Sequence, residues 1–400
     1  MSVLLPPLRG LFRDEDVSLL VDLRRDHHRH PELSWKEHRT SARLAEVVKS
    51  LGAVDVRTVA NTGVVARFAG RDRRAPLVAV RGDIDALPIE EATGLPFTST
   101  SPGVMHACGH DIHGTWAIGA ALLLARQPAA GDVLVVLQPA EEVGEGAKAI
   151  LDTGALDDVK AIFGGHVDRR FAVGQVVADA GPLAASADTF EIELLGKGAH
   201  GARPHESADP IVGAAALITA LQTIVARRLD PAAAAVVTVG SIHSGTAPNI
   251  IPERAALTGT LRATTPETRA AIGNEVRRIA ESVAESYRLT ARVTVNLGTP
   301  PIVNPAEGAS WARQAAAAVL GEAAVVPFGL TNMGGEDFAF YLERIPGCFM
   351  RIGAREEGGE RTAAHSPRFT AAEESIFVGA AVLAESARVA STALTAQQNR

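Results

Sequence analysis

The order of predicted helices and strands changes along the chain, and this order limits the folds open to it. Up to about residue 163, apolar runs typical of strands alternate with segments of helical periodicity. The predicted strands are 54–57, 64–68, 77–80, 132–137 and 160–163, and the predicted helices are 37–51, 113–126 and 146–152. Such alternation predicts an α/β fold with a largely parallel, helix-covered sheet.

A different pattern fills the middle of the chain. Its elements follow the order strand, helix, strand, strand, helix, strand, at 189–195, 210–227, 235–242, 255–262, 266–287 and 291–295. This βαββαβ order makes a complete small α+β domain of ferredoxin-like type. We therefore predict a discontinuous larger domain of residues 1–186 and 299–400, with an inserted domain of residues 187–298.

Composition and charge exclude several classes of partner. The formal net charge is −7 and no run of Lys or Arg appears, so nucleic acid is not an expected partner. The N-terminus lacks the basic start and apolar core of a secretion signal, and the apolar stretch 211–221 is shorter than a membrane-spanning helix. We expect a cytoplasmic protein without a membrane partner. Two cysteines are too few for a disulfide framework.

The densest cluster of chemically active side chains lies between residues 106 and 113. One thiol and three imidazoles occur within these eight positions, as expected for metal ligands. Gly109 separates Cys108 from His110, and a residue without Cβ allows the backbone to turn both side chains into one site. The alternative is a loop of solvated histidines beside a buried cysteine.

Two adjacent acids, Glu141 and Glu142, follow the apolar strand predicted at 132–137. Active sites of α/β sheets gather at the carboxyl ends of strands. Adjacent carboxylates there are costly unless each has a cation or a proton to share. One acid could bind a metal while the other acts on water. Alternatively, both are acids at the start of a helix, where they interact favourably with the helix dipole.

Two further histidines complete a possible ligand set. His166 follows the strand predicted at 160–163, and His365 precedes Ser366 and Pro367 near the C-terminus. Either could be a structural histidine. The five candidate ligands are Cys108, His110, Glu142, His166 and His365. This number is too large for one catalytic zinc but suits two metals if one ligand bridges, as a thiolate can.

Acids also alternate after the strand predicted at 77–80. Asp83 and Asp85 point to the same side of the chain, and Asp83 could hold a ligating imidazole in its metal-binding tautomer. The alternative is a strand end with solvated acids.

At this point the sequence resembles a known family, the amidohydrolase branch of the aminoacylase-like and carboxypeptidase-like dinuclear metallopeptidases. This branch includes hippurate hydrolases, indole-acetyl-amino-acid hydrolases and N-acetyl-diaminopimelate deacetylases. The similar segments span nearly the whole chain in the family's order: 28–37 (HRHPELSWKE), 81–91 (RGDIDALPIEE), 103–113 (GVMHACGHDIH), 138–148 (QPAEEVGEGAK), 196–210 (GKGAHGARPHESADP), 247–262 (APNIIPERAALTGTLR), 333–341 (MGGEDFAFY) and 365–369 (HSPRF).

The resemblance implies a role for each candidate residue. Cys108 would bridge two metals, with His110 and His166 on one and Glu142 and His365 on the other. Glu141 matches the general base and Asp83 the acid behind the ligands. In the inserted domain, His200 matches a histidine that donates to the acyl oxygen across a dimer interface, and Asn249 and Arg262 match residues that meet the substrate carboxylate. The implied fold is a phosphorylase/hydrolase-like catalytic domain with helices on both sheet faces, plus a lid or dimerisation domain.

The function expected from these features is hydrolysis of the amide bond of N-acyl amino acids, hippurate-like or N-acetylated. Two divalent ions are expected, zinc or manganese, with cobalt or nickel also compatible. The resemblance implies a homodimer through the lid domain, and a tetramer is a further option. A carboxypeptidase or dipeptidase would use the same metals and base. A binding protein without catalysis would not need Glu141 and all five ligands, and a mononuclear zinc deaminase would need a second cysteine pair.

Overall fold

The computed structural model describes residues 4–329 and 332–399. They form two compact units: unit 1 contains residues 4–181, 304–329 and 340–399, and unit 2 contains residues 182–303 and 332–339. The division lies within five residues of the boundaries 186/187 and 298/299 expected from the sequence, and it adds 332–339 to unit 2. The assignment of the units as catalytic domain and lid stays a prediction.

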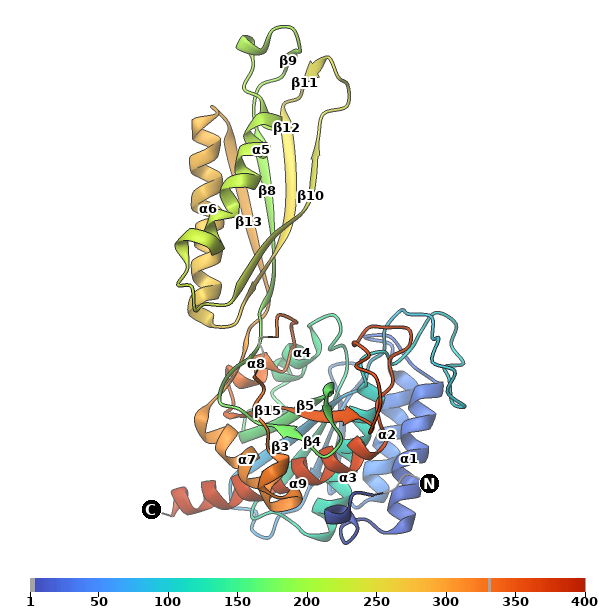
Figure 1. Ribbon diagram of the computed structural model, residues 1–400. Coiled ribbons are helices and arrows are strands. Elements are labelled where there is room, and N and C mark those ends of the chain that lie inside the picture. Colours follow the sequence, from blue (N-terminus) through green and yellow to red (C-terminus); the bar gives the residue numbers. More distant parts are fainter. Residues whose placement is uncertain (1–3, 330–331, 400) are drawn as a thin grey trace. The chain divides into compact units, whose positions relative to one another are not determined.

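Unit 1 is built on a seven-stranded sheet in the order β1-β2-β4-β3-β5-β15-β6 (Figure 1). Its strands are β1 (Asp55–Val59), β2 (Gly63–Phe68), β3 (Leu77–Asp83), β4 (Val133–Gln138), β5 (Val159–Ala172), β6 (Val176–Val177) and β15 (Gly347–Arg355). The central strands β4, β3, β5 and β15 are parallel to their neighbours in that group. The pairs β1–β2, β2–β4 and β15–β6 are antiparallel.

Helices cover this sheet. They are α1 (Asp14–Arg29), α2 (His38–Ser50), α3 (His110–Arg126), α4 (Gly146–Asp152), α7 (Ala306–Leu320), α8 (Ala339–Leu342) and α9 (Glu374–Gln398), with short 3₁₀ turns at Pro6–Leu8 and Glu322–Ala324. The helices α3 and α9 contact each other and β3. Every residue of β4 is buried, so both faces of the sheet are covered. The predicted α/β fold is confirmed.

The helix α9 is also long and apolar enough to cross a membrane, by length and composition alone. Its most apolar stretch is 72% buried within the protein, however, as expected for a core helix.

Unit 2 contains a four-stranded antiparallel sheet in the order β10-β12-β8-β13. Its elements are β8 (Ala187–Leu195), β9 (Ala199–His200), α5 (Pro210–Leu221), β10 (Ala235–Ser244), β11 (Ile250–Ile251), β12 (Arg254–Ala263), α6 (Pro266–Ser286) and β13 (Thr290–Thr299), with short helical turns at Pro204–Glu206 and Ile224–Arg228. Two short strands at its ends, β7 (Gly181–Ala184) and β14 (Ile302–Asn304), pair with each other.

Alternation explains how unit 2 buries one face of its sheet. Phe190, Ile192 and Leu194 on β8 belong to a hydrophobic core that also includes residues of α5 and α6. The intervening positions of β8 are exposed or half-buried. Period-two burial of this kind is the pattern of an antiparallel sheet with one covered face.

Some elements differ from their sequence-based bounds. The strand predicted at 160–163 continues to Ala172, because β15 pairs with β5 well beyond the last β3 partner. Helix α1 was not predicted, since four of its seven buried residues are the polar Asp16, Arg24, His27 and His28. A polar buried face hides the apolar periodicity by which a helix is identified.

One helical glycine in each unit allows a test of its packing: Gly379 in unit 1 and Gly273 in unit 2. A Cβ at Gly379 on α9 would lie 2.3 Å from the buried ring of Trp116 on α3, whereas one at Gly273 on α6 would make only an ordinary van der Waals contact, 3.9 Å from Val295. Overpacking costs about 1–3 kcal/mol, and alanine for glycine in an open helix gains about 0.5–1 kcal/mol. We expect Gly379→Ala to lower the melting temperature and Gly273→Ala to raise it, measured by calorimetry. Equal shifts in both variants would contradict this packing.

Candidate metal centre

The parallel strands of unit 1 bring three predicted segments to one edge of the sheet. Asp83 ends β3 and is paired in register with Gln138, the last residue of β4, which Glu141 and Glu142 soon follow. The β3–β5 register pairs Val80 with Phe163, so His166 lies three positions further, at the level of Asp83. Carboxyl ends of parallel strands meet at one edge, where sites of α/β proteins form.

The start of α3 supplies the next donors. Gly109 has φ +90°, and a Cβ there would lie 2.5 Å from Val167. Only glycine fits this left-handed, crowded position. The turn at Gly109 directs both Cys108 and His110 to the centre, as the sequence suggested.

Two triads of donor atoms share the Cys108 sulfur. The first is Cys108, His110 and His166, and the second is Cys108, Glu142 and His365. Within each triad the donor atoms lie within 4.8 Å of one another. Cys108 Sγ is 3.2 Å from His166 Nε2, and His365 Nε2 is 3.4 Å from Glu142 Oε2. The structure thus brings together all five side chains proposed as ligands.

The histidines of the first triad are held in the tautomer that binds a metal. His166 Nδ1 donates to the carbonyl of its neighbour Val167 at 2.7 Å. His110 Nδ1 lies 3.0 Å from the carbonyl and 3.1 Å from the carboxylate of Asp85, both of which are acceptors. In both rings Nδ1 therefore carries a proton, so Nε2 is the nitrogen that can bind a cation. Asp83 and Asp85 raise the pKa of His110 despite its burial, so a cation there would replace a proton.

A third imidazole in the region, His113, does not have a lone pair to offer. Its Nδ1 donates to Asp83 Oδ1 at 2.6 Å, and its Nε2 accepts from the Val167 amide at 3.0 Å. Burial lowers the pKa of His113, so the ring stays neutral. His113 lies within reach of a cation near His110 and Asp83, but both of its ring nitrogens are already bonded to Asp83 and Val167.

The contacts of the two buried acids differ from the expectation for Asp83. Asp83 binds the ring of His113 through Oδ1, and its Oδ2 accepts from Arg81. Asp85 orients the ligand candidate His110 instead, and it also accepts from the Glu142 amide at 3.0 Å. Sequence reasoning missed this contact, because alternation placed both acids on one side and gave no means of ranking them.

Burial makes the donor set unfavourable without positive charge. Burial raises the pKa of Glu142 to about 7, and it raises the pKa of the Cys108 thiol above its usual range. His110 Nε2 and Glu142 Oε1 are buried, and neither has a hydrogen-bond partner among the residues that the structure describes. Unpaired buried polar atoms cost free energy unless a ligand satisfies them. One thiol, three imidazole nitrogens and a carboxylate therefore fit divalent cations.

Glu141 lies at the edge of this donor set. Its Oε2 is 3.8 Å from His110 Nε2, and its side chain is 10% exposed, so water can reach it. The preceding residue, Ala140, has φ +52°, which is uncommon for a residue with a side chain. The chain therefore turns at Ala140, between the end of β4 and Glu141.

The candidate residues of unit 2 lie at two different ends of its sheet. His200 pairs with Ile250 in the β9–β11 ribbon, and the Gly201 amide donates to the Asn249 carbonyl at 2.8 Å. Both His200 and Asn249 line a cavity of about 710 Å³. Arg262 lies eight positions along β12 from Arg254, which borders that cavity, and its guanidinium donates to the Leu261 carbonyl at 2.9 Å.

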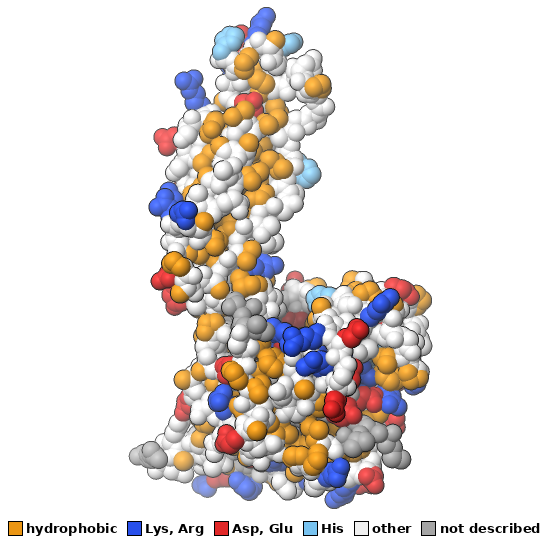
Figure 2. All heavy atoms as spheres, viewed as in Figure 1, with side chains coloured by type: hydrophobic (Ala, Val, Ile, Leu, Met, Phe, Trp, Pro, Cys, Tyr) orange, Lys and Arg blue, Asp and Glu red, His pale blue; other side chains and the backbone are white. Residues whose placement is uncertain are grey.

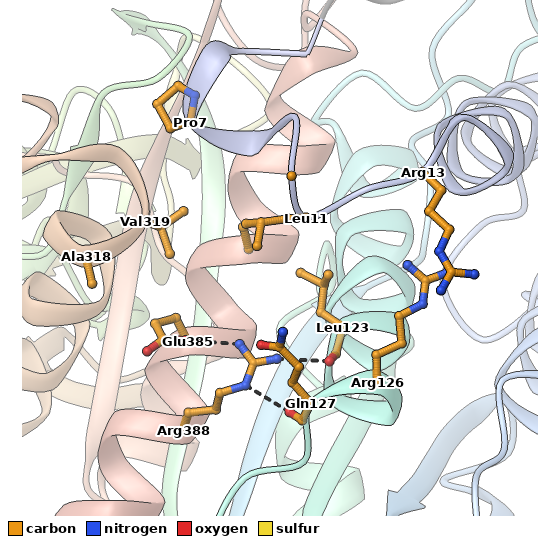
Figure 3. Close-up of a pocket in the computed structure, with 12 residues that line it drawn as sticks. Pro7, Leu11, Arg13, Leu123, Arg126, Gln127, Ala318, Val319, Glu385 and Arg388 are labelled. Carbon is orange, nitrogen blue, oxygen red and sulfur yellow. Dashed lines mark hydrogen bonds and ion pairs between the residues drawn. The ribbon is translucent and has the colours of Figure 1, made fainter.

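A second cavity, of about 430 Å³, lies in unit 1 between the first turn of the chain and helices α3, α7 and α9 (Figure 3). Arginines line it, but they are engaged with the protein itself. Arg126 bonds Asp16 at 2.5 and 2.6 Å, and Arg388 donates to the carbonyls of Leu123 and Gln127 at 2.9 Å each. None of the predicted site residues lines this cavity.

Known proteins resemble the chain over most of its length. It is 41% identical over 372 residues to the N-acetyl-L-cysteine deacetylase of Bacillus subtilis (strain 168), covering 92% of this chain and 87% of that protein. Thermostable carboxypeptidase 1 of Saccharolobus solfataricus is 36% identical over 368 residues, covering 90% and 92%. The crystal structure of the Bacillus subtilis YXEP protein, described as a dinuclear metal binding peptidase, has a TM-score of 0.84 and 36% identity, covering 94% of this chain and 99% of that one.

Residues 79–388 also match the family described as Peptidase family M20/M25/M40. The resemblance inferred from the sequence motifs is thereby confirmed. The chain belongs to Peptidase family M20/M25/M40 and is a hydrolase that acts on amide carbon–nitrogen bonds.

Proposed function

We propose that this hydrolase cleaves the amide bond of N-acyl amino acids, hippurate-like or N-acetylated, to a carboxylic acid and a free amino acid. The observation that carries the proposal is the pair of donor triads sharing Cys108, with Glu141 beside them. Support also comes from the deacetylase that is 41% identical to the chain.

The five donors would hold two divalent ions, zinc or manganese, with cobalt or nickel also compatible. Cys108 would bridge them, His110 and His166 would bind one, and Glu142 and His365 the other. When bound, the ions would supply positive charge that acidifies a water molecule and polarises the acyl oxygen. Asp85 would keep His110 in its ligating tautomer, while Asp83 and His113 would support the edge of β5.

Glu141 would carry the proton transfers. A carboxylate next to the ligand Glu142, itself outside the two donor triads, can take the proton of the attacking water. It can then hand that proton to the amine nitrogen as the amide bond breaks, general base first and general acid second. Arg262 and Asn249 would meet the free carboxylate of the substrate, and His200 would donate to the acyl oxygen.

The separation of these residues within unit 2 supports the proposal of a working unit of two chains. Arg262 lies roughly 26 Å along β12 from Arg254, at about 3.3 Å per residue, whereas His200 and Asn249 lie near Arg254. One small substrate cannot span that distance. His200 and Asn249 would therefore act on a substrate whose carboxylate is bound by the Arg262 of another copy.

The surface of unit 2 supports such a homodimer. Strand β10 is an edge strand, with Ile242 exposed, and Ile211 and Val212 are exposed on α5. Figure 2 shows hydrophobic side chains gathered along unit 2. Exposed apolar groups beside an open sheet edge favour association with a second chain. We propose a cytoplasmic homodimer, or a tetramer built from it, without a nucleic-acid or membrane partner.

A carboxypeptidase or dipeptidase is the second candidate, favoured by the carboxypeptidase that is 36% identical to the chain. The two functions share the metals and the base and differ only in the acyl pocket.

Substrate assays separate the two functions. We expect metal-free enzyme restored with zinc, manganese or cobalt to cleave N-acetyl amino acids or hippurate with a higher kcat/KM than dipeptides. Arg262→Ala should raise KM strongly for these acids and little for their amides, because a charge-assisted pair is lost only when the carboxylate is present. A preference for dipeptides would favour the carboxypeptidase, and equal KM changes for acids and amides would exclude Arg262 as the anchor.

The adjacent acids should respond differently to substitution. Glu141→Gln removes the proton acceptor but no ligand, so we expect both metals to stay bound while kcat falls by about 100-fold or more. Glu142→Gln replaces a ligating carboxylate with an amide and should lose one metal. Metal content by elemental analysis and kcat on an N-acetyl amino acid measure both effects. Normal turnover in Glu141→Gln would refute its role as base.

The dimer makes complementation possible. His200→Ala and Glu141→Ala should each be nearly inactive, but unfolding and refolding them together should restore part of the activity. A mixed dimer has one site with its own Glu141 and the partner's His200. If mixing restores nothing, His200 acts within its own chain or not at all. Refolding each variant alone is the control.

A further inference from the structure

The segment 32–37 lies beside the candidate centre without supplying a ligand. It contains two acids, and they have separate partners. The Glu32 carboxylate accepts from the amides of Arg39 at 3.1 Å and Thr40 at 2.8 Å. These amides belong to the first turn of α2, where a helix leaves its amides without internal partners. Glu32 is therefore the cap of α2.

Glu37 occupies the N-cap position of α2 but makes no capping bond with its side chain. Its carboxylate is fully buried and turned toward the loop after β4. Oε1 accepts from the Ala140 amide at 2.9 Å, and Oε2 accepts from the Thr62 hydroxyl at 2.6 Å. A carboxylate so deeply buried is costly even with two donors. Because Glu32 already caps the helix, we attribute the burial of Glu37 to its contact with Ala140.

Ala140 is the residue that directs the chain into Glu141. Its φ of +52° is disfavoured for a residue with a Cβ. Its carbonyl accepts from the amides of Glu145 at 3.3 Å and Gly146 at 3.1 Å. With the Glu37 carboxylate on its N–H, Ala140 is held on both sides. The structure therefore fixes a strained peptide immediately before the candidate base.

The other side of Glu141 is held in the same way. The Glu142 amide donates to Asp85 Oδ2 at 3.0 Å, and the Ser34 hydroxyl donates to the same oxygen at 2.7 Å. The amides of the residues before and after Glu141 thus both donate to buried carboxylates. The segment 32–37 supplies the first carboxylate, Glu37, and binds the second, Asp85, through Ser34. Backbone strain at functional sites persists only where surrounding contacts enforce it.

We propose that Glu37 is a positioning residue for Glu141: by accepting from the Ala140 amide, it holds the left-handed turn that aims the Glu141 carboxylate at the reacting water. This proposal rests on the proposed role of Glu141 as base. The hydrogen bonds of the Glu37 side chain go to Ala140 and Thr62 and to none of the five donors.

The test compares Glu37→Ala with Glu37→Gln. Alanine leaves the buried Ala140 amide without an acceptor, and we expect kcat to fall about 10- to 100-fold, as misplacement of a reacting group does. KM and bound metal should change little. Glutamine can still accept from Ala140 through its amide oxygen while its NH₂ group donates to Thr62, so it should keep most of the kcat. Rescue by glutamine would show that the acceptor matters and not the charge.

Glu32→Ala is the matched control. It removes a carboxylate from the same segment and uncaps α2, so it should lower the melting temperature while leaving kcat unchanged. Hydrogen exchange of a peptide covering 138–146, measured by mass spectrometry in metal-free protein, should rise in Glu37→Ala and not in Glu32→Ala or Glu37→Gln. If Glu37→Ala does not fold, Glu37→Asp keeps the charge but shortens the reach, and it should show the same pattern to a smaller degree.

Three results would overturn the proposal. They are a normal kcat in Glu37→Ala despite faster exchange, an equal loss of kcat in Glu37→Gln, and a loss of bound metal that accounts for the loss of activity. Failure of the proposed function is a separate result. Normal turnover in Glu141→Gln would refute the role of Glu141 as base, whereas the exchange measurement tests the contact between Glu37 and Ala140 independently of that role.

Discussion

The parallel pairing of β3, β4 and β5 is the constraint on which the candidate metal centre depends. β3 and β4 end at one edge, and β5 passes it at His166, so segments far apart in the sequence reach one another there. The register matters as much as the direction, because successive side chains of a strand point to opposite faces. A shift of one residue in β5 would turn His166 away from Cys108.

The backbone around the centre is strained where it changes direction. Gly109, Ala140 and His365 all have positive φ: Gly109 lies between two donors, His365 is a donor, and Ala140 precedes Glu141. For residues with a side chain, this conformation costs roughly 1–2 kcal/mol. Neighbouring contacts enforce it: the His365 amide donates to the Ala107 carbonyl at 2.8 Å, and Ala140 is held by Glu37. The surrounding contacts thus offset the free-energy cost of the strained backbone at the centre.

Two histidine–aspartate pairs lie side by side at the start of α3, and their second contacts give them different roles. In the pair of His110 and Asp85, the outer ring nitrogen is left for a cation. In the pair of His113 and Asp83, the outer nitrogen accepts the Val167 amide. Both rings donate from Nδ1 to a carboxylate, and they differ because the Val167 amide of β5 donates to the outer nitrogen of His113 and not to that of His110.

Much of this protein could be predicted from its sequence. Apolar periodicity predicts the helix-covered sheet and the inserted βαββαβ unit. The density of thiol and imidazole groups indicates Cys108 and His110, the adjacent acids indicate Glu142, and His166 and His365 are added only by the ligand count. These are local signals, carried by spacing within a segment. Helix α1 gave no such signal, because the residues that it buries are largely polar.

Only the tertiary structure decided the contacts between segments. The choice of Asp85 over Asp83 as partner of His110, the exclusion of His113, and the reach of Glu37 to Ala140 each join residues 25 or more positions apart. The separation of His200 from Arg262 along the sheet of unit 2 is a further case. Spacing along the chain cannot rank such contacts, since they depend on strand register and on the direction in which each buried side chain finds its partner.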